Sequence, residues 1–153
     1  MKVTLDIDQN YEQTRMTIHC KEIDDTVNEI LNFMKAKETE FLIGREGERQ
    51  HILKPQDIHF FYTQKDAVYA VTDKGEFKLK EKLYELEQLL APNRFVRLSK
   101  SVIANLREFS HFEPSFNGTL CVFFKSGKKE YVTRHYVKAI KETLKMNRRE
   151  TNE

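Results

Sequence analysis

Polar and apolar residues alternate with a period of two near the start of the chain. The alternation covers residues 3–7 and, after a polar interruption, residues 15–20, and it is the pattern of a half-buried strand. The apolar spacing then changes to that of a helix, with Asp24 or Asp25 available as the N-cap residue. We therefore expect residues 1–38 to form a short strand–strand–helix extension.

From residue 39 onward the period of two returns in short runs that turn residues separate. The predicted strands cover residues 41–43, 50–53, 58–62, 67–71, 76–79, 95–98, 102–105, 109–112, 120–124 and 130–132. Gly44-Arg45-Glu46-Gly47 is interpreted as the hairpin turn between the first two strands. It also matches the GxxG loop of KH nucleic-acid domains, but that loop joins two helices. Asn117-Gly118 is the strongest hairpin signal in the chain.

Helical spacing appears twice more, in a leucine-rich segment over 83–90 and in a final segment over 136–146. The sequence thus predicts an α+β fold dominated by antiparallel sheet, with one domain over 39–148 and a charged tail over 149–153. No two predicted helices are close enough in sequence to form a helix-turn-helix pair, so any DNA contact is expected from loops and strands.

Composition is that of a globular protein with a charged surface, because 39% of the 153 residues are hydrophobic and 33% are charged. No apolar run approaches the roughly 18–20 residues that cross a bilayer, so we expect no membrane contact. Cys20 and Cys121 are far apart and have no second metal ligand at short spacing. We interpret them as reduced thiols of a cytoplasmic protein, with no metal site.

Motifs of the common enzyme classes are absent. The chain has no P-loop, no GxSxG, no HExxH and no GxGxxG after a strand. Its histidines are dispersed and are interpreted as surface or half-buried strand residues. We therefore expect no catalysis, no cofactor and no small-molecule substrate.

Charge is unevenly distributed. Residues 1–38 hold five Lys/Arg against eight Asp/Glu, a net of −3, and residues 39–153 hold 21 against 16, a net of +5. Acidic residues are missing from 88–107, 114–129 and 131–141, where Lys and Arg stand beside hydroxyl and amide side chains. Such runs suit contact with phosphates, although a solvated basic face would have the same composition.

Two blocks of sequence resemble the LytTR family of bacterial DNA-binding domains. The more specific block is Phe95-Val96-Arg97-Leu98-Ser99-Lys100-Ser101-Val102-Ile103-Ala104-Asn105, and the second runs from Ser126-Gly127 to Arg134-His135-Tyr136. Together with Pro55–Phe61 and the leucine helix, the resemblance covers roughly residues 40–148. It implies a transcription regulator with an antiparallel β-fold whose loops enter successive major grooves of duplex DNA.

The resemblance also implies roles for individual residues. Lys100 and Arg134 fall where family members contact bases, and the Gln64-Lys65-Asp66 loop falls where a further contact is made. The remaining candidate DNA-binding residues are Arg97, Ser99, Ser101, Asn105, His135 and Lys138. This sequence departs from the family pattern at Ser99, Ala104 and Thr133, which puts the preferred DNA sequence in question.

The 38 residues before the match are too few for a phospho-receiver domain. We expect them to mediate homodimerisation or to receive a signal. Two other functions stay open: a binder of single-stranded nucleic acid that uses Phe60, Tyr62 and Tyr69 on a sheet, and a protein-interaction module whose basic loops meet an acidic partner.

Overall fold

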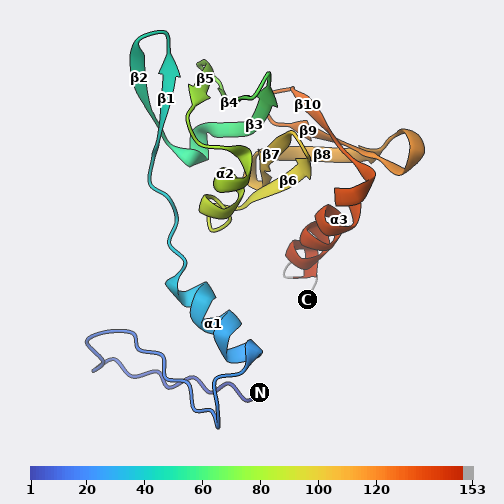
Figure 1. The fold of residues 1–153 in the computed structure, drawn as a ribbon. Coiled ribbons are helices and arrows are strands. Elements are labelled where there is room, and N and C mark those ends of the chain that lie inside the picture. Colours follow the sequence, from blue (N-terminus) through green and yellow to red (C-terminus); the bar gives the residue numbers. More distant parts are fainter. Residues whose placement is uncertain (150–153) are drawn as a thin grey trace. The chain divides into compact units, whose positions relative to one another are not determined.

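The chain divides into two compact units, Met1–Ala36 and Lys37–Glu153. The computed structural model describes residues 1–149, and of residues 146–149 it describes the backbone only. The charged tail predicted over 149–153 therefore lies outside the described residues, apart from the backbone of its first residue. Figure 1 gives the order of the elements within each unit.

The first unit contains one helix, α1 (Asp25–Lys35). Its N-cap is Asp24, whose Oδ1 accepts a hydrogen bond from the amide of Val27 at 2.9 Å, as expected of a capping aspartate. The strands predicted over 3–7 and 15–20 are wrong, because no strand is assigned in residues 1–24. Alternation gives an extended segment one apolar face, but a stable strand also needs a neighbouring strand to pair with. Neither segment has such a neighbour here.

The second unit is built on a seven-stranded antiparallel sheet and a three-stranded one. In sheet order the large sheet contains β2 (Arg49–Leu53), β1 (Leu42–Glu46), β5 (Gly75–Leu79), β4 (Ala67–Thr72), β3 (Ile58–Gln64), β7 (Val102–Asn105) and β6 (Phe95–Ser99). The small sheet contains β10 (Lys129–Val132), β9 (Leu120–Phe124) and β8 (Phe109–Pro114). The helices are α2 (Leu83–Leu89) and α3 (Arg134–Arg149). The predicted α+β fold and all ten strands predicted from residue 39 onward are confirmed.

Two apolar cores cover the two faces of the large sheet. On one face, Phe61 and Ile103 pack with Leu86 and Leu90 from α2 and the residue after it. On the other, Phe60, Ala104 and Leu98 pack with residues of the small sheet and of α3, among them Val122 and Ile140. The central strand β3 is therefore buried on both faces. The small sheet and α3 cover the second of these faces.

Glycine is required at one position of this packing. A Cβ on Gly44 of β1 would lie 2.6 Å from a side-chain carbon of Leu53 and 2.7 Å from Cβ of Phe77. The predicted hairpin of β1 and β2 is confirmed, since the two strands pair from Leu42 with Leu53 to Glu46 with Arg49. The predicted position of its turn is wrong, because residues 44–46 pair within β1 and the turn is at Gly47 and Glu48. The KH interpretation is excluded because strands flank the turn.

The segment that enters the second unit is fixed at Thr39. Its amide donates to Oδ1 of Asn93 at 2.9 Å, and its carbonyl accepts from Nδ2 of Asn93 at 3.1 Å. Asn93 is buried, at 7% exposure, so its amide is committed to this contact. Nearby, Arg107 forms an ion pair with Glu38 at 3.5 Å. Only Ala36 to Glu38 separate the end of α1 from the fixed point.

Candidate nucleic-acid interface

Three segments distant in sequence meet at one end of the sheets. The amide of Thr63, in β3, donates to the carbonyl of Ser101 at 3.0 Å, and the amide of Thr133 donates to the carbonyl of Leu98 at 3.0 Å. These bonds hold the β3–β4 turn, the β6–β7 turn and the start of α3 together. We call the exposed residues of 64–66, 100–101 and 134–138, together with 116–117 of the β8–β9 loop, which is described below, the turn face.

The β3–β4 turn is a tight hairpin, since Gln64 pairs directly with Ala67. Lys65 and Asp66 have φ of 49° and 64°, the left-handed conformation that a type I′ turn requires at both central positions of a two-residue hairpin. Neither is a glycine, so the turn has adopted this backbone at some conformational cost. In return, a lysine stands at the tip with its side chain exposed.

The β6–β7 turn has Lys100 and Ser101 at its tip, because Ser99 pairs with Val102. Ser99 is buried, and its hydroxyl accepts a hydrogen bond from the amide of Ser101 at 3.2 Å. Nη2 of Arg97 donates to the carbonyl of Lys100 at 3.1 Å. The side chain of Lys100 itself is exposed. Arg97 and Ser99 therefore hold the backbone of the turn, while the ammonium group of Lys100 is accessible.

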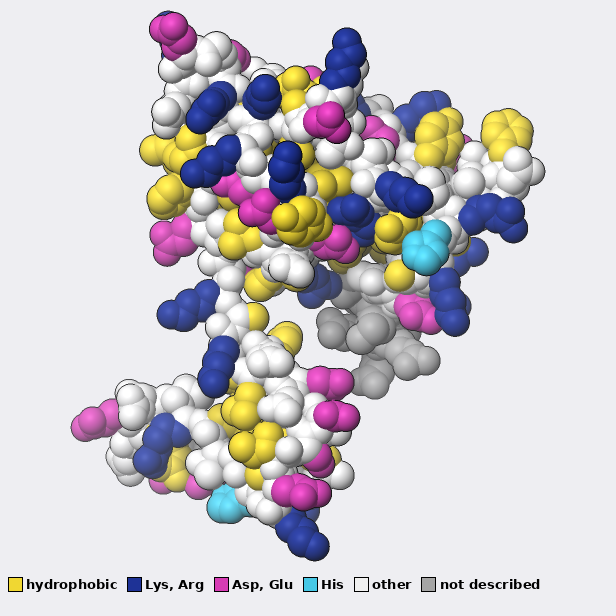
Figure 2. Space-filling view, in the orientation of Figure 1, with side chains coloured by type: hydrophobic (Ala, Val, Ile, Leu, Met, Phe, Trp, Pro, Cys, Tyr) yellow, Lys and Arg dark blue, Asp and Glu magenta, His cyan; other side chains and the backbone are white. Residues whose placement is uncertain are grey.

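The start of α3 adds Arg134, His135 and Lys138, all exposed, and has no acidic residue in its first turn. The His135 ring stands edge-on to Tyr136 with centroids 4.8 Å apart. Figure 2 shows further Lys and Arg side chains around this part of the molecule. Most of the candidates thus share one surface: Gln64, Lys65, Lys100, Ser101, Arg134, His135 and Lys138.

The β8–β9 loop also reaches this surface, although none of its residues is among the candidate DNA-binding residues. A Cβ on Gly118 would lie 3.5 Å from Nε of Arg134, so the loop borders that side chain. Its Phe116 is 85% exposed, and Asn117 has φ of 53°. The signal for a hairpin at Asn117-Gly118 was present in the sequence, but nothing there indicated that its tip would stand beside Arg134.

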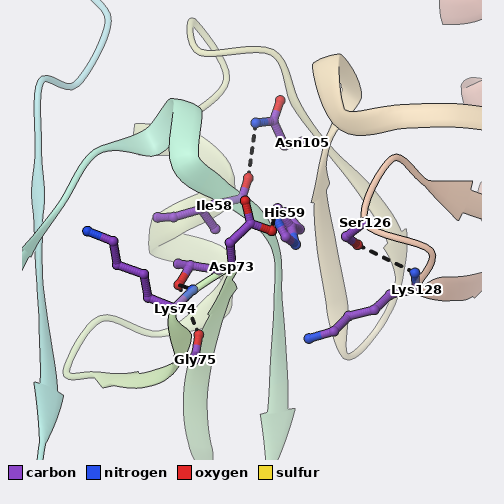
Figure 3. Close-up of polar contacts among 9 residues, drawn as sticks. Ile58, His59, Asp73, Lys74, Gly75, Asn105, Ser126 and Lys128 are labelled. Atoms are coloured by element: carbon purple, nitrogen blue, oxygen red, sulfur yellow. Dashed lines mark hydrogen bonds and ion pairs between the residues drawn. The ribbon is translucent and has the colours of Figure 1, made fainter.

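Asn105 does not belong to the turn face. It lies at the other end of β7, is 1% exposed, and donates from Nδ2 to the carbonyl of Ile58 at 3.0 Å (Figure 3). Its Oδ1 accepts from the amide of Arg107 at 3.0 Å. Both Nδ2 and Oδ1 of Asn105 are thus bonded within the protein. The expectation that Asn105 contacts DNA is therefore corrected, and we assign it a structural role.

One acid-free run is likewise divided by the fold. Strand β9 starts at the turn face and ends at Phe124, so the β9–β10 turn with Lys125 and Lys128 lies at the opposite end. The amide of Lys125 donates to the carbonyl of Glu108, just before β8, at 2.9 Å. Figure 3 shows Ser126 and Lys128 in the same region as Asn105. Proximity in sequence therefore overstated how many cations share one surface.

The family model described as LytTr DNA-binding domain matches residues 48–145, from the β1–β2 turn into α3 and including every segment of the turn face. The chain belongs to the LytTR family. The solved LytTr DNA-binding domain of a Bacillus cereus protein has the same fold, with a TM-score of 0.66 at 17% identity over 69% of this chain and 97% of that domain.

Relatives of about the same length as this chain match beyond the LytTR domain. An uncharacterized HTH-type transcriptional regulator of Staphylococcus aureus strain NCTC 8325 is 34% identical over 145 residues, which are 94% of this chain and 98% of the relative. Its counterpart in strain MRSA252 is 33% identical over the same shares. Most of the first unit therefore also has a counterpart there. In the described residues α2 and α3 are separated by five strands, so they form no helix-turn-helix pair.

The three aromatic residues proposed for stacking, Phe60, Tyr62 and Tyr69, form no open platform. Phe60 is 5% exposed and lies in the second core. Tyr62 stacks on Tyr69 with centroids 5.4 Å apart, and its hydroxyl donates to Oε2 of Glu76 at 2.7 Å. That hydrogen bond raises the pKa of Tyr62 to about 12. A single strand stacking on these rings is therefore not favoured over duplex binding by the LytTR turns.

Other features of the LytTR domain bear on chemistry. His59 is 3% exposed and its Nε2 lies 3.1 Å from Oδ1 of Asp73 (Figure 3), so the expectation that it is a surface or half-buried residue is wrong. Within residues 1–149, no three His, Cys, Asp or Glu side chains gather as metal ligands would. No helix of that stretch combines the length and apolar character needed to span a bilayer.

Proposed function

We propose that this protein regulates transcription by binding duplex DNA through the turn face of its LytTR domain. The observation behind the proposal is the convergence of exposed cations from three segments, with Asp66 as the acidic exception. Phosphate contact needs such cations, and base recognition needs long donors on protruding elements. The names of the Staphylococcus aureus relatives, which describe transcriptional regulators, support the same function.

In this proposal Lys100 and Arg134 reach base edges in the major groove. Lysine and arginine suit guanine O6 and N7 there. Lys65, Ser101 and Lys138 contact phosphates, and Gln64 and His135 supply further polar contacts. Arg97 and Ser99 act through the turn that they hold, because their side chains are largely covered.

The test compares alanine variants across the two ends of the sheet. A duplex recovered by the full-length protein from a random library serves as the specific site, and a shuffled duplex serves as the nonspecific one. We expect Lys100→Ala and Arg134→Ala to lose about 1–3 kcal/mol on the specific site and to relax preference at one base position each. Lys128→Ala is the matched control, since Lys128 is exposed and cationic but lies at the other end.

Two results would contradict this assignment. If Lys128→Ala weakens binding as much as Lys100→Ala, the turn face is not the contact surface. If the Lys100 and Arg134 variants lose equally on both duplexes, their contacts are with phosphate. Competition by single strand that exceeds competition by duplex would favour the single-stranded function instead.

We propose further that residues 1–38 mediate homodimerisation and do not touch DNA. Their net charge of −3 would be repelled by phosphates. The large apolar side chains of this segment are mostly exposed, including Ile23, Phe33 and Met34 at 66%, 79% and 55%, which is typical of surfaces that await a partner. A two-fold dimer would match paired half-sites on one DNA face.

A chain that begins at Lys37 tests this proposal against full length. Sedimentation should give a dimer only for the full-length protein at micromolar concentration. The dissociation constant for a duplex with one half-site should be equal for the two proteins. For a duplex with two half-sites, the full-length protein should have the lower dissociation constant. We also propose that the protein acts in the cytoplasm, where a bacterial chromosome lies. Its proposed role, DNA binding, requires no catalytic step.

A further inference from the structure

The strand β2 forms an open edge of the LytTR sheet. It pairs with β1 on one side, and the sheet order ends there. Its Ile52 is 71% exposed and lies directly across from Ile43, which is 37% exposed, while Phe41 on the same face is 54% exposed. Figure 1 shows the β1–β2 hairpin at the margin of the sheet, and Figure 2 shows hydrophobic side chains over that region. An exposed apolar edge is a template for another strand.

A hollow of about 430 Å³ adjoins this edge. Phe41 and Ile52 line it together with polar residues that include Glu40 and Lys54. The lining is mostly polar, with Phe41 and Ile52 as its apolar part, so it suits a strand that carries apolar and polar side chains in alternation. The edge therefore offers both free backbone groups and a recess beside Ile52.

Residues 3–8 have the complementary pattern. Val3, Leu5 and Ile7 alternate with polar residues, and they are 77%, 81% and 88% exposed. No strand is assigned to them in the single chain. The strand pattern and the absence of a partner are reconciled if the neighbouring strand comes from another molecule.

We propose that residues 3–8 of one copy add as an antiparallel strand to β2 of a second copy, with Leu5 opposite Ile52. This inference rests on the proposed homodimer and names its surface. Strand addition supplies affinity through backbone hydrogen bonds and specificity through alternate side chains. The reciprocal addition from the second copy closes a two-fold assembly in which both edges are covered.

The charges favour this direction. With Leu5 opposite Ile52, an antiparallel strand places Asp8 opposite Arg49. A parallel strand in the same position would instead set Lys2 opposite Arg49. Opposite charges stabilise a cross-strand pair and like charges destabilise it, so the antiparallel arrangement is favoured.

Cysteine cross-linking between two differently tagged chains tests the register. Cys20→Ser removes the exposed native thiol in both chains. One chain then carries Leu5→Cys and the other Ile52→Cys, and directly opposed positions are within disulfide reach after small adjustments. Mild oxidation of the mixture should give a linked heterodimer. The control pairs Leu5→Cys with Tyr84→Cys, a 64% exposed position on α2, and should link at least 10-fold less.

Two further variants keep the inference open to refutation. Leu5→Asp and Ile52→Asp are exposed and should leave the circular dichroism spectrum unchanged, while each raises the dimer dissociation constant at least 10-fold. Tyr84→Asp should not. The inference is overturned if a chain carrying both Leu5→Cys and Ile52→Cys links within itself, or if Ile52→Asp stays dimeric. Binding of these variants to a single half-site is measured separately, so loss of the dimer and loss of DNA binding are distinguished.

Discussion

Nη2 of Arg97 donates to the carbonyl oxygen of Lys100 at 3.1 Å, so the arginine holds the turn from which the lysine projects. On its other side, Nη1 of Arg97 lies 3.3 Å from Oε2 of Glu87 in α2. The arginine side chain is 17% exposed. Its charge is therefore largely committed to Glu87, and its effect on DNA passes through the position of Lys100.

This arrangement predicts the sign of a charge substitution. Glu87→Gln removes an acidic group and weakens the hold on Arg97. If Arg97 positions the turn, affinity for the selected duplex should fall about 2–10-fold, in line with loss of a hydrogen-bonded charge contact. If Arg97 is itself a phosphate contact, removing the nearby acid should tighten binding. Fluorescence anisotropy at constant salt measures the difference, and Glu85→Gln on the same helix is the control.

Salt dependence provides a second prediction. Each phosphate neutralised by Lys or Arg contributes about −0.9 to the slope of log K against log salt on duplex DNA. We expect a steep slope between 50 and 200 mM salt. Lys138→Ala should reduce the magnitude of the slope by about 1, whereas Lys128→Ala should leave it unchanged. A flat dependence for the unmodified protein would contradict the electrostatic contact altogether.

Substitution of Asn105 should affect stability and leave the contact surface intact. The side chain is buried and forms hydrogen bonds with Ile58 and Arg107. Asn105→Ala leaves a buried carbonyl and amide without those partners, which costs about 2–3 kcal/mol in the free energy of unfolding. Urea denaturation measures this loss. DNA affinity of the folded fraction should stay within twofold, and a larger loss would return Asn105 to the interface.

Tyr62 predicts a pH dependence at alkaline pH. Its hydrogen bond to Glu76 raises the pKa to about 12, above the value of about 10 in an unfolded chain. The bonded form is the protonated one, so its stabilisation is complete below about pH 10 and is lost as pH rises toward 12. The difference in unfolding free energy between the unmodified protein and Tyr62→Phe should shrink across that range. A difference that is constant with pH would contradict this role.

The two thiols should differ in reactivity. Cys20 is exposed, whereas Cys121 is 3% exposed and its burial raises the pKa of the thiol. The thiolate is the reactive form, so an aromatic disulfide reagent should label one thiol rapidly in the native protein at pH 8. The second should react only on unfolding. Cys20→Ser should abolish the rapid phase, and a persistent rapid phase would contradict the packing of β9.

The sequence was most informative where local pattern and tertiary pairing agree. The hairpins of β1 with β2 and of β8 with β9 were predictable because turn chemistry and alternation occur together there, although the first turn is at Gly47 and Glu48. Residues 3–7 have equally good alternation and yet form no strand. The pattern describes the faces of a strand, whereas pairing depends on a second segment that the pattern does not identify.

The same distinction applies to the candidate site. Lys100 and Arg134 are 34 residues apart, and their segments are brought together by tertiary contacts: the hydrogen bond between Thr133 and Leu98 and the packing of Leu98 in the second core. The resemblance to LytTR domains anticipated this, but charge patterning did not. Patterning grouped Lys128 with the other cations although the direction of β9 and β10 places it at the far end.

The fixed point at Thr39 has a consequence for the operator. Four Cα steps separate Lys35 from Thr39, a span of at most about 14 Å when fully extended. In a dimer that also fixes α1, this span limits how far the turn face of each LytTR domain can move. Inserting five base pairs between half-sites would turn one of them by about half a helical turn of DNA, onto the opposite face. The dimer should then protect only one of the two half-sites. The spacing between half-sites is therefore part of what this protein recognises.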